Sequence, residues 1–205
     1  IDEYMQAHPT HEIFALVGTA GSTNLGIIDD LQSLGEFANR NNIWFHVDGA
    51  YGLAGLCAPS LRPQFNGIEK CDSFIVDPHK WLFAPFDACA LVYRNPDIAK
   101  KAHTQKASYL ETLEDEHEWN PSDYAIHLTR RPRGLPFWYS LSANGTKAYA
   151  DAVEDTMDTT RIAVRLIKEH PNLDLLMEPT LSIVAFTRKG WNAEDYQEWS
   201  DDLLA

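Results

Sequence analysis

The chain has 205 residues, 44% of them hydrophobic and 23% charged, which is ordinary for a globular protein of one or two domains. Its 30 acidic and 17 basic residues give a net charge of −13, which argues against a broad nucleic-acid-binding surface. Three cysteines without C-x-x-C spacing argue against a disulfide framework or a thiolate zinc site. No apolar run approaches the roughly 20 residues of a membrane span. We therefore expect a cytoplasmic protein that binds neither nucleic acid nor membrane.

Short apolar runs alternate with helical patterns in the first half of the chain. Strands are predicted at residues 12–18, 43–48, 73–77 and 89–94, and a helix is predicted at residues 29–42. In that helix Leu31, Leu34, Phe37 and Ala38 share one face. Strands separated by crossovers predict an α/β fold with a mostly parallel sheet and flanking helices.

The pattern changes in the second half. Residues 103–133 are polar, charged and aromatic without a clear period, and we expect a mobile loop at about 103–125. A helix is predicted from near Thr146 to His170, and a strand, a second strand and a helix follow it. We therefore predict a large domain at residues 1–145. Residues 146–205 would form a connecting helix and the beginning of a small α+β domain.

The first candidate site segment is G-T-A-G-S-T-N-L-G at residues 18–26, directly after the first predicted strand. Small and hydroxylated residues at the carboxyl end of a strand let N–H and O–H groups approach a phosphate. The segment does not match the P-loop pattern of nucleotide-binding proteins. An ordinary strand-to-helix loop is the alternative.

The second segment is W-F-H-V-D-G-A-Y-G at residues 44–52. Asp48 ends a hydrophobic strand, where a carboxylate needs a cation or several hydrogen-bond donors. A metal, an arginine or the protonated ring nitrogen of a cofactor would serve. His46 would share the strand face with Asp48, but no third ligand is clustered nearby, so we predict no metal site. An aspartate that caps a turn is the alternative.

The third segment is D-P-H-K-W-L at residues 77–82, between two apolar patches. Desolvation among apolar groups favours the neutral amine of a lysine. A neutral amine is a nucleophile that forms a Schiff base with a carbonyl compound. The alternative is that Lys80 extends from a surface turn into solvent.

The three segments follow successive predicted strands, whose carboxyl ends share one edge of an open α/β sheet. Together they match the needs of pyridoxal 5′-phosphate. The loop would hold the phosphate, Lys80 would bind the aldehyde, and Asp48 would keep the ring nitrogen protonated. A protonated ring accepts electrons from a substrate carbanion.

On these motifs the chain resembles the group II amino acid decarboxylases, which are pyridoxal-phosphate enzymes of fold type I. H-V-D-G-A-Y-G is similar to that family's H-V-D-A-A-Y segment. D-S-F-I-V-D-P-H-K-W-L is similar to its lysine motif D-S-x-x-x-N-P-H-K-W-L, and the spacing from Asp48 to Lys80 also fits. F-D-A-C-A-L-V-Y-R and R-R-P-R-G-L-P-F-W bring the chain closest to the aromatic L-amino acid branch.

The resemblance implies a role for each matching residue. Lys80 corresponds to the Schiff-base lysine and Asp48 to the partner of the pyridine nitrogen. Ala50 would pack against the ring of the cofactor. His79 would reach the cofactor phosphate, and Thr23 would lie near it.

Tyr109 matches the mobile-loop tyrosine that, in the family, returns a proton to the substrate carbon after carbon dioxide leaves. The loop of the family reaches the neighbouring subunit, so the resemblance also implies a homodimer. Gly49 stands where the family has alanine, a change that we expect to be mild. The chain does not begin with methionine. Compared with the family pattern, it lacks the part of the large domain that carries a histidine stacked on the pyridine ring, and its C-terminal domain is cut short. We therefore expect a fragment that is inactive alone.

The implied reaction is α-decarboxylation of an L-amino acid, most simply an aromatic one, to an amine and carbon dioxide. Other pyridoxal-phosphate chemistry stays open: aldehyde synthase, aminotransferase, carbon–sulfur lyase, or glutamate or diaminobutyrate decarboxylase. Because loss of the proton donor favours aldehyde formation in the family, Tyr109 favours decarboxylation. A non-catalytic homologue or fragment that serves dimerisation is a further alternative. The sequence does not name the amino acid.

Overall fold

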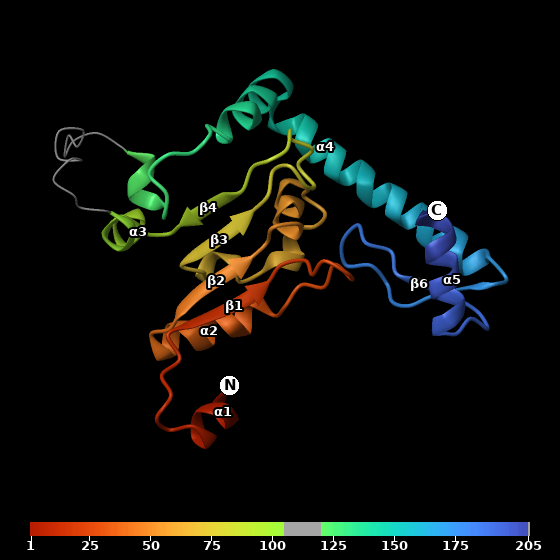
Figure 1. The fold of residues 1–205 in the computed structure, drawn as a ribbon, viewed down its shortest axis with the longest axis horizontal. Coiled ribbons are helices and arrows are strands. Elements are labelled where there is room, and N and C mark those ends of the chain that lie inside the picture. Colours follow the sequence, from red (N-terminus) through yellow and green to blue (C-terminus); the bar gives the residue numbers. More distant parts are fainter. Residues whose placement is uncertain (105–119, 205) are drawn as a thin grey trace.

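The computed structural model describes residues 1–104 and 120–204 (Figure 1). The first part contains α1 (Asp2–Ala7), β1 (Ala15–Thr19), α2 (Leu31–Asn41), β2 (Trp44–Asp48), β3 (Ser73–Val76), β4 (Ala90–Tyr93) and α3 (Pro96–His103). The second contains α4 (Gly134–Glu169), β5 (Leu173–Leu175), β6 (Phe186–Arg188) and α5 (Ala193–Leu204). Short 3₁₀ helices lie at Gly52–Cys57, Arg62–Phe65, Ile68–Lys70 and Pro121–Tyr124. Over these described residues, no helix combines the length and apolarity that a membrane crossing requires.

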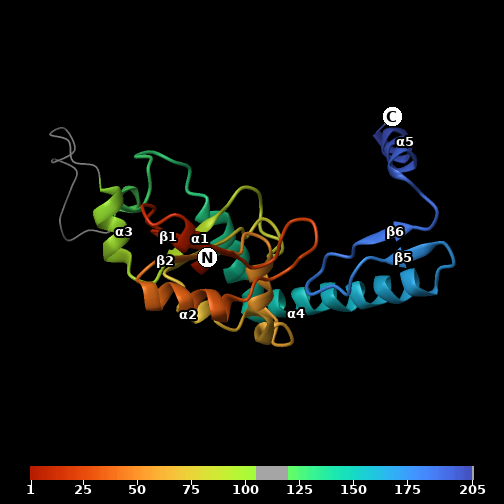
Figure 2. The ribbon, with the colours of Figure 1, turned by 90° about the horizontal axis from the view of Figure 1, so that it is seen from below.

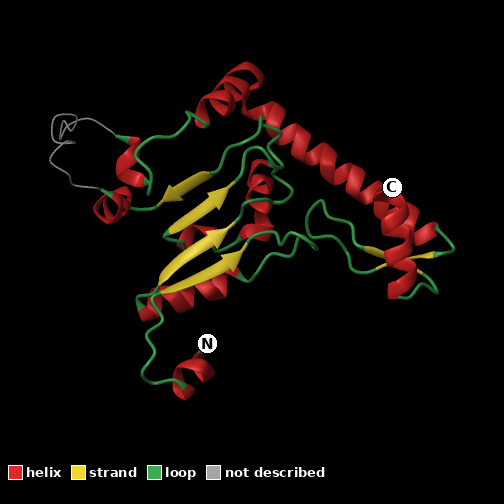
Figure 3. Ribbon diagram, in the orientation of Figure 1, coloured by secondary structure: helices red, strands yellow, loops and turns green. Residues whose placement is uncertain are grey.

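Strands β1 to β4 lie side by side in one sheet, in the order β1-β2-β3-β4 (Figure 3). The first three strands are parallel, and β4 runs antiparallel to β3. The register sets Thr19 opposite Asp48 and Asp48 opposite Ile75, so the three parallel strands end at one edge. The predicted α/β fold with a mostly parallel sheet is confirmed. Each predicted strand is found, with ends that differ from the predicted ones by at most three residues.

Helix α2 lies along one face of the sheet (Figure 2). Its N-terminus is capped by Asp30, whose side chain accepts a hydrogen bond from the backbone N–H of Ser33 at 3.0 Å. Such a cap contributes about 1 kcal/mol. The predicted apolar face is confirmed: Leu31 and Ala38 are buried in the same core as Phe45 of β2. This packing holds the sheet, and with it the strand ends, in a fixed position.

Helix α4 leads from the sheet to the C-terminal segment (Figures 1 and 2). At Gly145 the backbone has φ 76° and ψ 162°, a conformation that essentially only glycine adopts, and the helix is kinked there. The predicted helix began near Thr146, directly after this kink. The structure adds the turns from Gly134, because Pro136 lies in the first turn of a helix, where proline is tolerated.

The C-terminal strands are shorter than predicted. Only Leu173–Leu175 and Phe186–Arg188 pair, in antiparallel register. Leu181, which we expected in a strand, is instead fully buried in the core beneath the sheet edge. The chain around it therefore joins the core of the first part, and the division into two domains near residue 145 stays a prediction.

The segment predicted as a long loop is ordered at both of its ends. His103 closes α3, and a 3₁₀ helix forms at Pro121–Tyr124. An ion pair of 3.2 Å between Lys100 and Asp123 joins the two. Tyr109 lies outside the described residues, and its proposed role is not tested by the structure.

Candidate active site

Asp48 is the last residue of β2 and lies half-buried at the sheet edge. Its Oδ1 accepts a hydrogen bond from the backbone N–H of Ala50 at 3.1 Å. The carbonyl of Ala50 in turn accepts a hydrogen bond from the N–H of Asp77 at 2.9 Å. The turn-capping contact is therefore present, and it fixes Asp48 and Ala50 beside the segment that carries Lys80.

Gly49 makes room for a core side chain. An alanine Cβ at this position would lie 2.0 Å from the Cγ and 2.6 Å from the Cβ of Leu53, which is buried. Because a contact below 3.0 Å forces one of the two groups to move, alanine does not fit here while Leu53 keeps its position. Leu53 thus occupies the space that an alanine Cβ would take, and the expectation that this change from the family pattern is mild stays a prediction.

Lys80 lies in a tight turn after β3. Its backbone N–H donates to the carbonyl of Asp77 at 2.9 Å, and its Nζ forms an ion pair of 2.8 Å with Asp77 Oδ2. The flanking Trp81 and Leu82 are buried, but the side chain of Lys80 is 44% exposed. The predicted apolar setting is therefore wrong for the amine itself: the turn buries its neighbours and leaves the lysine to a carboxylate and solvent.

A hollow of about 380 Å³ lies beside Lys80. It is lined by Thr23, Tyr51, Lys80, Trp81, Phe83 and Ile183. Tyr51 and Trp81 stack with their ring centroids 5.1 Å apart and their planes at 20°. The Tyr51 hydroxyl accepts a hydrogen bond from the N–H of Ser182 at 3.0 Å, which brings the neighbouring Ile183 to the hollow. Thus two of the predicted site residues, Thr23 and Lys80, line one hollow.

The indole N–H of Trp81 is buried and has no hydrogen-bond partner within the described residues. A buried donor without a partner is costly, and such a group in a native structure calls for an explanation. Other atoms of Trp81 line the hollow, beside this buried N–H.

Cys89 is a site residue that the sequence analysis did not identify. Its thiol hydrogen-bonds with the Asp77 carboxylate. Although the residue has exposed surface, partial desolvation, followed by this hydrogen bond and the charge of Asp77, raises the pKa of the thiol to about 11. The antiparallel pairing of Val76 with Ala90 brings the preceding Cys89 next to Asp77. A prediction that β4 runs antiparallel to β3 would have identified Cys89 as a neighbour of the site.

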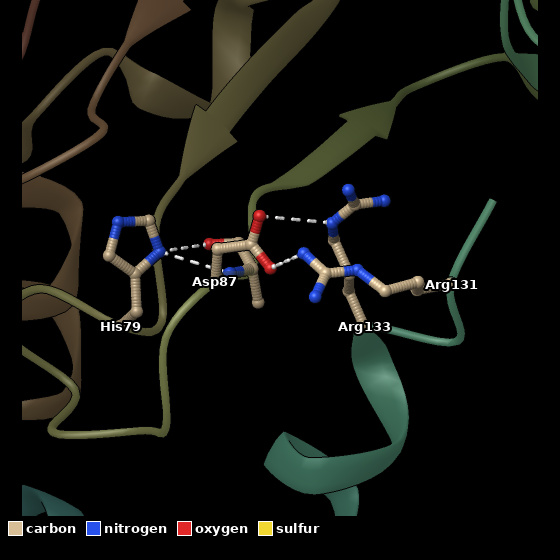
Figure 4. A network of polar contacts seen from close by, with 5 residues as sticks. His79, Asp87, Arg131 and Arg133 are labelled. Carbon is tan, nitrogen blue, oxygen red and sulfur yellow. Dashed lines mark hydrogen bonds and ion pairs between the residues drawn. The ribbon is translucent and has the colours of Figure 1, made fainter.

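His79 contacts the backbone segment before β4 (Figure 4). Its Nδ1 lies 2.6 Å from the carbonyl oxygen and 3.1 Å from the nitrogen of Ala88. The next carboxylate, Asp87, pairs with Arg131 at 2.9 Å and with Arg133 at 3.2 Å. Desolvation opposes ionisation of Asp87, but the hydrogen bond from Arg133, a backbone hydrogen bond and the charges of Arg131 and Arg133 together outweigh it and lower the pKa of Asp87.

This network connects the lysine turn with the start of α4. It gives two arginines of the motif R-R-P-R-G-L-P-F-W a structural role, as partners of Asp87. The contact of His79 with a phosphate stays a prediction. His46 is engaged elsewhere: its Nδ1 lies 2.7 Å from the Ser73 hydroxyl, and burial lowers the pKa of His46. Residues 1–104 and 120–204 hold no group of three His, Cys, Asp or Glu side chains able to bind a metal.

Comparison with known proteins places this geometry in context. The family model described as the pyridoxal-dependent decarboxylase conserved domain matches residues 5–189. The human acidic amino acid decarboxylase GADL1 is 32% identical over 176 residues, which are 84% of this chain and 34% of that protein. An aromatic-L-amino-acid decarboxylase of Bacillus atrophaeus is 30% identical over 175 residues, 84% of this chain and 36% of that protein.

Among solved structures, tryptophan decarboxylase of Catharanthus roseus in complex with L-tryptophan matches with a TM-score of 0.83 and 25% identity. The match covers 99% of this chain and 42% of that structure. The chain thus spans about a third of the length of the curated relatives.

Proposed function

The chain belongs to the pyridoxal-dependent decarboxylase family, and from this membership we propose that the whole protein decarboxylates an L-amino acid at its α-carbon. The products are an amine and carbon dioxide. The observation that carries the proposal is the meeting of Lys80, Asp48 and Thr23 at the carboxyl ends of three successive parallel strands. Relatives that are named as decarboxylases of acidic and of aromatic amino acids support the reaction class.

The residues at this edge fit pyridoxal 5′-phosphate. Lys80 offers an amine for the aldehyde at the wall of a hollow of about 380 Å³. Asp48 offers a carboxylate for the ring nitrogen, and the Ala50 N–H holds it in place through Oδ1. Thr23 offers a hydroxyl at the same hollow, and the buried Trp81 N–H beside it is without a partner among the described residues.

When bound, the cofactor supplies an electron sink for the charge that remains on the substrate after carbon dioxide leaves. Lys80 would hold it through a covalent bond at Nζ and give way to the amino group of the substrate. Asp48 would keep a proton on the ring nitrogen. Ala50, His79 and Thr23 would position the ring and phosphate, and Tyr109 would donate a proton to the α-carbon.

We assign the substrate to the aromatic amino acids. Tyr51, Trp81 and Phe83 give the hollow aromatic walls, and Lys80 is the one cation among the described residues that line it. An acidic side chain would need a further cation to offset its desolvation. An aromatic side chain gains instead from burial against these rings.

A substrate panel on the full-length protein tests this function. We expect carbon dioxide and the amine in equal amounts, and kcat/KM for L-tryptophan, L-tyrosine or L-phenylalanine at least about tenfold above that for L-glutamate or L-aspartate. A preference for the acidic substrates would overturn the assignment to aromatic amino acids. Aldehyde and ammonia as products would overturn decarboxylation.

The proposal includes a homodimer in the cytoplasm, as the family resemblance implies. The three cysteines are free, which suits a reducing compartment. Light scattering on the full-length protein should give twice the mass of one chain, and the mass of a monomer would contradict the dimer.

A further inference from the structure

We infer that Asp77 is a positioning residue for Lys80: its carboxylate holds the amine at the wall of the hollow and restrains its attack on a carbonyl until the ion pair opens. The inference deepens the proposed function, because it concerns the lysine to which that function assigns the cofactor. Neither the proposed reaction nor the resemblance assigns a role to Asp77.

The contact between the two residues is built into the turn. Asp77 directly follows β3, and Lys80 comes three residues later. Their backbones are joined by the hydrogen bond from Lys80 N–H to the Asp77 carbonyl, at 2.9 Å. Their side chains are joined by the ion pair of 2.8 Å. The backbone bond fixes the two Cα positions, so the amine has the carboxylate within reach of its side chain.

Asp77 is itself held from three directions. Its N–H donates to the Ala50 carbonyl, its carboxylate accepts the Cys89 thiol, and its side chain is only 13% exposed. Burial opposes ionisation, but the hydrogen bonds from Lys80 and Cys89 outweigh it and keep the pKa of Asp77 below its usual value. The carboxylate is therefore charged at neutral pH, and it cannot turn away from the amine without also losing the contact with Cys89.

Among the described residues, few other charges act on the pair. His79 acts on Asp77 with a weak attraction, and Asp48 acts on the neighbouring thiol of Cys89. Lys80 is thus the main cation that faces Asp77, from the same turn, while Cys89 approaches from β4. An amine held by a carboxylate at 2.8 Å has to leave that contact before its lone pair can reach a carbonyl carbon.

The lysine motif that this segment resembles has asparagine where this chain has Asp77. Asparagine has nearly the same shape but carries no charge, so Asp77→Asn removes the ion pair and preserves the packing. The chain also offers a matched control. Lys100 and Asp123 form an ion pair of 3.2 Å with 40% and 11% of their side chains exposed, against 44% and 13% for Lys80 and Asp77.

The experiment is competitive acetylation of the chain with trace acetic anhydride between about pH 6 and pH 10, quantified at each lysine by mass spectrometry. In Asp77→Asn we expect acetylation of Lys80 near neutral pH to rise about threefold or more, while that of Lys100 stays constant. In Asp123→Asn we expect acetylation of Lys100 to rise and that of Lys80 to stay constant. The same labelling of Lys80 in Asp77→Asn and the unaltered chain would overturn the inference, as would an equal rise in Asp123→Asn.

A second measurement does not depend on any variant. The Lys80 side of the pair is 44% exposed, so salt of about 1 M should weaken the ion pair, and acetylation of Lys80 in the unaltered chain should rise from low to high salt near neutral pH. A flat salt response would contradict the ion pair. Because acetic anhydride needs no cofactor, these outcomes are independent of whether Lys80 binds pyridoxal phosphate. A failure of the proposed function would appear separately, as the absence of a cofactor adduct.

Discussion

Replacing Asp48 by asparagine is expected to lower kcat for decarboxylation by about 10²- to 10⁴-fold in the full-length protein. An amide cannot keep a proton on the ring nitrogen, whereas its oxygen can still accept the hydrogen bond from Ala50 N–H that now reaches Asp48 Oδ1. The variant should therefore have a lower kcat but an unchanged thermal unfolding temperature. Steady-state kinetics at saturating substrate, together with a thermal unfolding curve, measure both.

Asp72→Asn is the matched control for this variant. The Asp72 carboxylate also accepts a backbone hydrogen bond, from Phe45 N–H at 2.8 Å, but it lies at the opposite end of the sheet, before β3. We expect its kcat to stay within a few-fold of the unaltered protein. Equal losses in the two variants, or an Asp48→Asn protein with nearly full activity, would remove Asp48 from the catalytic machinery.

Gly52→Ala is expected to lower the free energy of unfolding by about 3 kcal/mol or more. A Cβ at Gly52 would lie 2.1 Å from the backbone oxygen of Ala20 and 2.7 Å from Leu181 Cδ1. The first of these neighbours is backbone and cannot rotate away. Urea unfolding followed by fluorescence or circular dichroism gives the free energy directly.

This close approach also bears on the site, because Ala20 precedes the Thr23 loop and Gly52 follows the Asp48 turn. Gly134→Ala serves as the control, since a Cβ there meets no atom within 4 Å. We expect that variant to change the unfolding free energy by less than about 1 kcal/mol. If Gly52→Ala proved as stable as Gly134→Ala, the two loops would not be in contact as described.

The sheet and its functional edge were predictable because they follow from local patterns. Val47 and its neighbours in β2 are apolar enough to predict a buried strand, and the crossovers predict parallel neighbours. Parallel strands share a carboxyl edge, so Asp48 and the Thr23 loop were expected close to Lys80 before any coordinates. These predictions needed only the order of elements along the chain.

Other features depend on contacts between distant residues and were not predictable from local patterns. The exposure of Lys80 results from how the turn after β3 folds, which apolar flanking residues do not specify. Cys89 reaches Asp77 only because β4 reverses direction. Leu181 looked like a strand residue, but burial in the core near Gly52 outweighed its strand propensity.

The central claim is that Lys80 carries the cofactor, and borohydride reduction of the full-length protein with pyridoxal 5′-phosphate, followed by peptide mapping, tests it most directly. We expect the reduced adduct on the peptide that contains Lys80, and its loss in Lys80→Arg. An adduct found instead on another lysine, such as Lys70 or Lys100, or one that persists in Lys80→Arg, would contradict the account.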